Sequence, residues 1–121
     1  MLKLDTKSVH LSYAFGEIEE AAGNLDQAYQ YYKSAHILAG HWLLPILKLA
    51  SVSMTIGKYD EANLWLQKAE VLDSKNLSTI ARKAEFYSLR NNLFEASKAL
   101  ETLFENGRNP FASPPLDELT V

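Results

Sequence analysis

The chain has 121 residues, with 12 Lys and Arg against 15 Asp and Glu, and it contains no Cys. This length fits one compact domain or a short array of repeats, and it buries enough surface to fold without a disulfide or a structural metal. The lack of Cys excludes thiol catalysis and thiolate metal sites. The net charge of -3 gives no sign of the clustered basic residues that nucleic-acid binding requires, so no nucleic-acid partner is expected.

The N-terminal residues 1–15 contain no apolar segment of signal-peptide length, because two Lys, one Asp and one His interrupt them. The longest apolar run, residues 37–50, is broken by a glycine, a histidine, a proline and a lysine. It falls short of the roughly 20 residues needed to cross a bilayer. We therefore expect a soluble, cytoplasmic protein with no membrane insertion.

Three segments, at residues 23–28, 57–62 and 91–96, repeat at intervals of 34 residues. Each begins with a residue that tolerates the left-handed backbone at the end of a helix, and each ends with alanine, whose small side chain lets paired helices approach closely. These positions are therefore expected to serve repeat packing. They are Gly23, Gly57 and Asn91 in the turns, and Ala28, Ala62 and Ala96 after them.

Apolar residues recur at spacings of three and four before and after each turn, which is the pattern of amphipathic helices. Pro45 fits only the first turn of its helix, so it helps to fix where the second unit begins. The sequence thus predicts an all-α protein made of three helical hairpins. The expected helices are 7–22, 25–39, 42–56, 59–73, 77–90 and 93–105.

With this 34-residue period, the chain resembles the tetratricopeptide repeat (TPR) family over about residues 9–106. The second unit matches best, and it lacks the Pro that usually closes a repeat. The resemblance implies an α-solenoid of three hairpins with a right-handed superhelix, in a domain 1–106 with units of about 9–42, 43–76 and 77–106. The residues that carry the match are Leu49, Ala50, Gly57, Tyr59, Ala62, Leu66 and Ala69.

The C-terminal residues 107–121 contain three of the four prolines and are expected to form an irregular tail. Ser113 followed by Pro114 and two acidic residues is a helix-start signal. Either a short capping helix begins here, or the chain is a fragment of a larger TPR protein.

The resemblance implies a concave groove lined by the first helix of each unit, which would bind a peptide or helix of a protein partner. We expect an apolar centre, acids at one end of the groove and bases toward the other. Alternatively, these positions are ordinary solvent-exposed residues that bind no partner. The predicted groove residues are Tyr13, Glu17, Leu44, Leu47, Lys48, Ser51, Arg82 and Glu85, with His10, Glu20, Thr55, Ser78 and Ala81 at further positions.

Several functions remain open within this class. A role in the assembly or secretion of a larger complex is one, as in small bacterial relatives. The carboxylate clamp by which some family members bind chaperone C-termini is not expected, because only Arg82 among its matching positions has the required type. A structural alternative is a homodimer formed through the uncovered last helix. That alternative would use Phe94, Leu103 and Phe104.

An enzymatic function is not indicated. The three imidazoles, His10, His36 and His41, do not have the helical spacing that brings two ligands to one metal. The acidic cluster at residues 17–20 has no metal partner and is typical of a solvated surface. We find no phosphate loop, nucleophile elbow or dinucleotide motif. The sequence therefore predicts a non-catalytic protein that needs neither a cofactor nor a metal.

Overall fold

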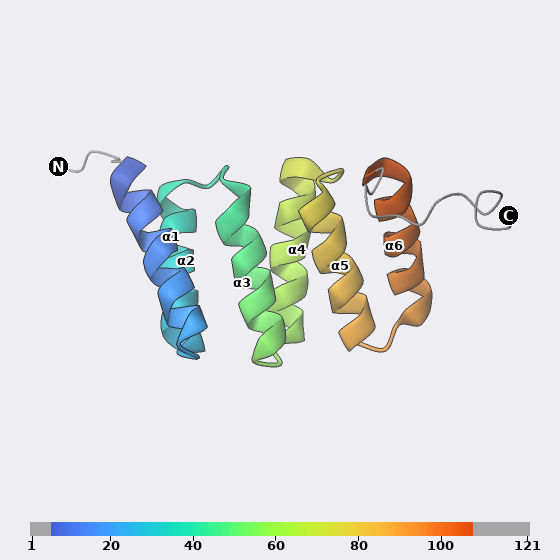
Figure 1. Cartoon of the computed structure of the whole chain (residues 1–121), viewed down its shortest axis with the longest axis horizontal. Coiled ribbons are helices and arrows are strands. Elements are labelled where there is room, and N and C mark those ends of the chain that lie inside the picture. Colours follow the sequence, from blue (N-terminus) through green and yellow to red (C-terminus); the bar gives the residue numbers. More distant parts are fainter. Residues whose placement is uncertain (1–5, 108–121) are drawn as a thin grey trace, which may run out of the picture.

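The computed structural model describes residues 6–107, which form six helices and no strand (Figure 1). All predicted helices are present, and their ends differ from the expected ones by no more than two residues. The helix start expected at Ser113 lies outside the described residues. The helices are α1 (Thr6–Ala21), α2 (Leu25–Leu38), α3 (Leu43–Thr55), α4 (Tyr59–Asp73), α5 (Leu77–Leu89) and α6 (Leu93–Gly107).

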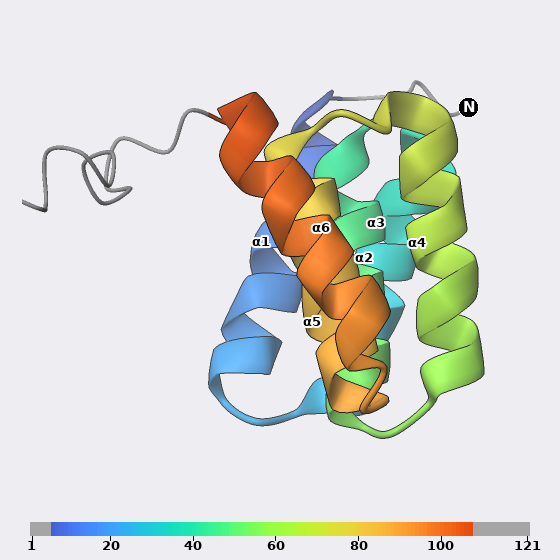
Figure 2. The ribbon, with the colours of Figure 1, turned by 90° about the vertical axis from the view of Figure 1, so that its right-hand side faces the viewer.

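The helices form three antiparallel pairs, α1 with α2, α3 with α4 and α5 with α6, which stand side by side in a row. Successive pairs touch through α2 and α3 and through α4 and α5, and α3 also contacts α5. Figure 2 looks along this row from the end formed by α6. The expected all-α solenoid is therefore confirmed.

The turn inside each pair has the same backbone conformation. Gly23, Gly57 and Asn91 have φ angles of 85°, 83° and 60°, in the left-handed region that their residue types favour. The residue after each turn then donates its backbone N–H across the helix end, which satisfies a carbonyl that the helix leaves unpaired. These bonds run from Asn24 to Glu19, from Lys58 to Ser53 and from Asn92 to Tyr87, each with an N–O distance of 2.8 Å.

The hydrophobic core is one continuous cluster along the row, and its buried members come from α2, α3, α4 and α5. Tyr32 of α2 and Leu49 of α3 are completely buried in it. The repeat alanines Ala28 and Ala62 are also fully buried and let the helices of a pair approach closely. Within residues 6–107, the buried side chains of the end helices, Val9 of α1 and Ala96 of α6, lie outside this cluster, and each end helix packs mainly on the other helix of its pair.

A close contact between the first two helices makes Gly16 sensitive to substitution. A Cβ atom at Gly16 would lie 2.6 Å from Cδ1 and Cε1 of the buried Tyr32 ring. We expect Gly16→Ala to lower the free energy of unfolding by about 1–2 kcal/mol, because overpacking costs about 1–3 kcal/mol and the better helix propensity of Ala returns at most about 1. Urea denaturation measures this change.

Gly40→Ala is the matched control, because the nearest atom to its new Cβ would be 3.9 Å away. Its free energy of unfolding should stay within about 0.5 kcal/mol of the unsubstituted chain. A Gly16→Ala protein as stable as the Gly40→Ala protein would contradict the tight packing of α1 on Tyr32.

Candidate functional site

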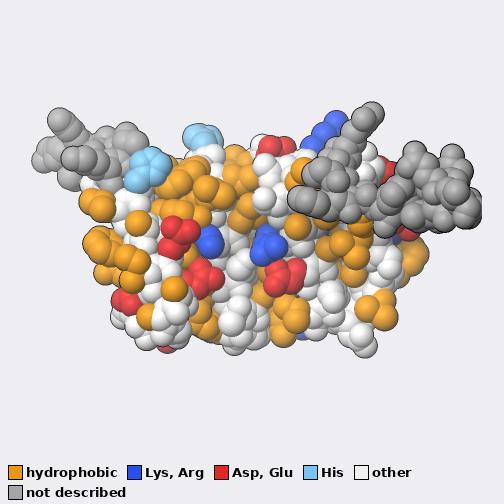
Figure 3. Space-filling model, viewed as in Figure 1, with side chains coloured by type: hydrophobic (Ala, Val, Ile, Leu, Met, Phe, Trp, Pro, Cys, Tyr) orange, Lys and Arg blue, Asp and Glu red, His pale blue; other side chains and the backbone are white. Residues whose placement is uncertain are grey.

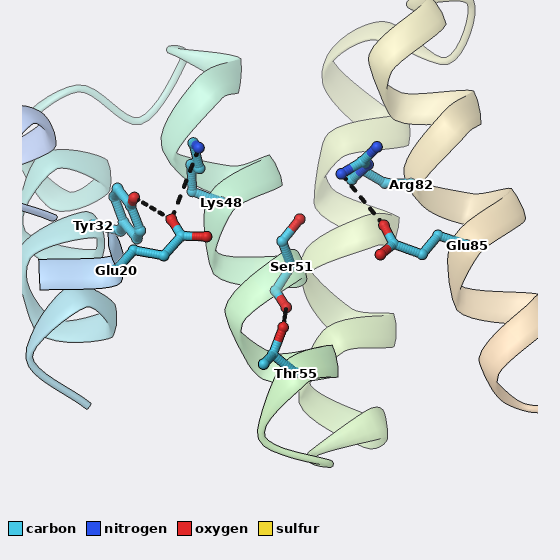
Figure 4. A network of polar contacts seen from close by, with 7 residues as sticks. All are labelled: Glu20, Tyr32, Lys48, Ser51, Thr55, Arg82 and Glu85. Carbon is cyan, nitrogen blue, oxygen red and sulfur yellow. Dashed lines mark hydrogen bonds and ion pairs between the residues drawn. The ribbon is translucent and has the colours of Figure 1, made fainter. Parts of the chain in front are cut away.

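The first helices of the three units, α1, α3 and α5, surround an open groove of about 440 Å³. Six of the eight predicted groove residues line it, and Figure 4 shows how the polar side chains among them lie. The lining residues are Glu20, Leu44, Leu47, Lys48, Ser51, Thr55, Ser78, Ala81, Arg82 and Glu85.

The two leucines of the groove differ in how much a ligand can reach them. Leu44 is 45% exposed, whereas Leu47 is only 6% exposed and belongs to the core cluster. Leu44 is therefore the apolar side chain that the groove offers to a ligand. A charge introduced at Leu47 would disturb the core before it tested binding.

The charges of the groove are paired locally, so the expectation of acids at one end and bases at the other is wrong. Nζ of Lys48 lies 3.8 Å from Oε1 of Glu20, and Nη1 of Arg82 lies 3.3 Å from Oε1 of Glu85. On this face of the molecule, blue and red side chains stand next to each other across the middle (Figure 3). All four side chains are about one-third to one-half exposed, and such pairs contribute only about 0–1 kcal/mol. A carboxylate of a ligand can therefore compete for either cation.

Glu20 is held in place by a buried hydroxyl (Figure 4). The Tyr32 hydroxyl donates a hydrogen bond to Oε1 of Glu20 at 2.5 Å. Burial, together with this bond, raises the pKa of Tyr32 well above its usual value, so the hydroxyl stays protonated and continues to donate. The sequence placed Tyr32 in the core, but it gave no signal that the Tyr32 hydroxyl would reach this carboxylate.

The other two predicted groove residues do not line the cavity. Tyr13 is half-buried, with its ring 5.6 Å from the Tyr32 ring and 4.9 Å from the Trp42 ring. Burial, followed by the charges of Glu17 and Glu20, raises the pKa of Tyr13 to about 12. Glu17 is exposed to solvent. The expected contribution of Tyr13 to the apolar centre is therefore wrong, because its ring packs against other aromatic rings.

The predicted self-association residues of α6 are not equivalent. Phe94 and Phe104 are exposed, whereas Leu103 is partly buried. Helical geometry explains the difference, because adjacent positions point about 100° apart and cannot share a face. Leu103 therefore contributes less to the outer surface of α6 than its neighbour.

Residues 6–107 show neither a metal-binding cluster nor a membrane-spanning helix. No group of three or more His, Asp or Glu side chains within this range is arranged to hold a metal ion. In the same range, no helix combines the length and the apolar character that crossing a membrane requires.

His36 packs edge-on against Trp65 with ring centroids 5.3 Å apart, and burial lowers the pKa of the His36 imidazole.

Comparison with known sequences identifies a curated relative. No family model matches the chain. The TPR repeat-containing protein MJ1428 of Methanocaldococcus jannaschii is 27% identical over 111 residues, which cover 90% of this chain. The same residues cover 19% of that protein, so this chain spans about a fifth of the relative's length.

Several solved structures share the fold. The type III secretion translocator chaperone SycD of Yersinia enterocolitica has a TM-score of 0.81 and 20% identity, covering 98% of this chain and 88% of that one. The first TPR of Spaghetti (RPAP3), bound to an HSP90 peptide, has a TM-score of 0.79 and 20% identity, covering 88% and 85%. PcrH, in complex with the chaperone-binding region of PopD, has a TM-score of 0.78 and 20% identity, covering 91% and 84%.

Three hairpins with a 34-residue period, stacked in a row with a groove along their first helices, define an α-solenoid. Solved TPR structures share this architecture, and the curated relative carries TPR repeats. The chain therefore has the fold of tetratricopeptide repeat proteins and resembles their repeats in sequence.

Proposed function

We propose that this chain is a non-catalytic, cytoplasmic interaction module that binds an extended segment of a protein partner in the groove between α1, α3 and α5. The observation that carries the proposal is the exposed Leu44 beside two cations, Lys48 and Arg82, in one groove of about 440 Å³. Two structures of similar fold, RPAP3 bound to an HSP90 peptide and PcrH in complex with the chaperone-binding region of PopD, support it. A role in the assembly or secretion of a larger complex would follow from such binding.

The chemistry of the groove favours a particular kind of peptide. An apolar side chain of the peptide would cover Leu44, and a carboxylate beside it would compete with Glu20 for Lys48 or with Glu85 for Arg82. The Ser51 and Ser78 hydroxyls in the lining can bond to the peptide backbone. The preferred ligand is thus a segment in which apolar and acidic residues alternate.

Selection of random peptides displayed on phage tests this proposal without knowledge of the natural partner. Peptides selected on the unsubstituted chain should share an apolar residue next to an acidic one. Their affinity should fall about tenfold or more for Leu44→Asp, because the lost apolar contact is worth about 1–2 kcal/mol. Arg82→Glu should lower the affinity for those peptides that contain the acidic residue. Isothermal titration calorimetry with synthetic copies of the peptides measures both effects.

Val71→Asp is the matched control, because Val71 is exposed on α4 and does not line the groove. Peptides that bind Leu44→Asp and the unsubstituted chain equally well would overturn the proposal, as would a selection that enriches no peptide.

A further inference from the structure

Both ends of the row of helices expose apolar side chains (Figure 3). Three residues of α1, which we call the head face, are between 47% and 61% exposed, and three of α6, the tail face, are between 45% and 63% exposed. A solenoid normally ends in repeats with a polar outer surface, which keeps it soluble. Neither face has that character. The head face consists of Leu11, Phe15 and Ile18, and the tail face of Leu93, Leu100 and Phe104.

The 34-residue period shows whether a preceding unit would cover the head face. The positions one and two periods after its three residues lie on α3 and α5. All six of these side chains are buried or half-buried. The head face therefore has the register of a surface that the preceding unit covers. The equivalent residues are Pro45, Leu49 and Val52 on α3, and Thr79, Lys83 and Phe86 on α5.

The tail face has the complementary register. The positions one and two periods before its residues lie on α4 and α2, and all six side chains are again buried or half-buried. The tail face therefore corresponds to the surface that the following unit covers. The equivalent residues are Tyr59, Leu66 and Glu70 on α4, and Leu25, Tyr32 and His36 on α2.

The contact between the second and third units shows how these positions meet. The Tyr59 ring of α4 lies edge-on to the Phe86 ring of α5, with centroids 6.5 Å apart. Nζ of Lys83 on α5 lies 2.5 Å from Oε2 of Glu70 on α4. On α6, one period later, the positions equivalent to Tyr59 and Glu70 are Leu93 and Phe104. On α1, two periods earlier, the positions equivalent to Phe86 and Lys83 are Ile18 and Phe15. The two faces thus pair aliphatic with aliphatic and ring with ring.

The same comparison favours the two end faces as partners for each other. In the internal contact, Lys83 and Glu70 form an ion pair. If Phe104 packed against a lysine equivalent to Lys83, or Phe15 against a glutamate equivalent to Glu70, that charge would be left without a partner in the contact. Two Phe rings facing each other avoid this cost and prefer tilted or edge-on packing. This matched chemistry favours a second copy of this chain as the occupant of each face.

We propose that the chain self-associates head to tail, with the tail face of one copy packed on the head face of the next as α4 packs on α5. Because the two faces differ, the contact does not close within a dimer, and further copies can add. The first helices of successive copies would then continue the groove along the array. This inference is independent of peptide binding, since neither face lines the groove.

Sedimentation velocity of the full chain over about a hundredfold range of concentration tests this proposal. The mean mass of the unsubstituted chain should rise with concentration beyond that of a dimer. Phe15→Glu removes the head face and Phe104→Glu removes the tail face, so each variant alone should be a monomer. An equimolar mixture of the two should form a dimer and nothing larger, because each variant retains the face that the other has lost.

Both substituted residues are exposed, so the variants should fold, and circular dichroism checks that they do. Val71→Glu, exposed on α4 away from both ends, should associate like the unsubstituted chain. A monomer at every concentration would overturn the proposal, since the faces would then have another occupant or none. A variant that still dimerises alone would point to a symmetric contact and would also overturn it, as would a mixture that stays monomeric.

Discussion

Leu49→Ala is expected to lower the free energy of unfolding by about 2–5 kcal/mol, the usual cost of removing a fully buried leucine side chain. Leu49 is completely buried in the core cluster, which extends from α2 to α5. The loss combines the transfer free energy of the deleted methyl groups with the cavity that they leave. Because Leu49 lies in the middle unit, which both other units contact, neither end unit can compensate.

Urea denaturation followed by circular dichroism measures this loss as a lower midpoint. Solenoid units are coupled mainly to their neighbours, so a weakened middle unit can also broaden the transition. Leu64→Ala, the same substitution at an exposed leucine of α4, should change the free energy by no more than about 0.5 kcal/mol. Equal midpoints for the two variants would disprove the central position of Leu49 in the core.

Trp65→Ala should cost about 3–5 kcal/mol, because a large buried side chain is lost together with its contacts to another unit. Its Nε1–H donates to the Tyr29 hydroxyl of α2 at 3.1 Å, and its ring meets His36 of the same helix. The Tyr29 hydroxyl in turn donates to Oε2 of Glu61 at 3.3 Å. Trp65 therefore joins the first and second units through both apolar and polar contacts.

Trp65→Phe separates these contributions. The variant keeps an aromatic ring and loses the hydrogen bond, so we expect a smaller loss of about 1–2 kcal/mol. Thermal and urea denaturation followed by circular dichroism serve both variants, since substitution removes one of the chain's two tryptophans from fluorescence. If Trp65→Phe were as unstable as Trp65→Ala, the ring contacts would contribute little and our account of this junction would fail.

The two proposals for this chain can fail separately. Leu44→Asp changes the groove and leaves the end faces intact, whereas Phe15→Glu and Phe104→Glu change the ends and leave the groove intact. Loss of peptide binding in an otherwise associating protein would support groove recognition alone. Loss of association with unchanged peptide affinity would support the head-to-tail contact alone.

The sequence predicted the fold closely because the determinants of a helical repeat are local. A 34-residue period, apolar residues at helical spacing and Gly or Asn at each turn establish the hairpins before any tertiary contact is known. The φ angles of Gly23, Gly57 and Asn91 agree because few other residues adopt that conformation at low cost. The repeat register likewise placed Tyr32 in the core, where it is completely buried.

The candidate groove was less predictable. The resemblance to the family indicated which face of each first helix points inward, and six of the eight predicted residues line the cavity. Tyr13 does not, because Tyr32 and Trp42 offer its ring a packed aromatic site. Leu47 also lines the groove but is almost completely buried, whereas Leu44 is exposed. The sequence pattern alone does not distinguish these two leucines.

The sequence by itself therefore determined the helices, their turns and the order of the units, since each depends on residues close together in the chain. Only the tertiary structure decided which side chains meet between units. Glu20 lies beside Lys48 and the Tyr32 hydroxyl because the rotation and spacing of α1, α2 and α3 bring them together. The exposed end faces likewise depend on the tertiary structure, because a residue's register does not reveal whether a neighbouring unit covers it.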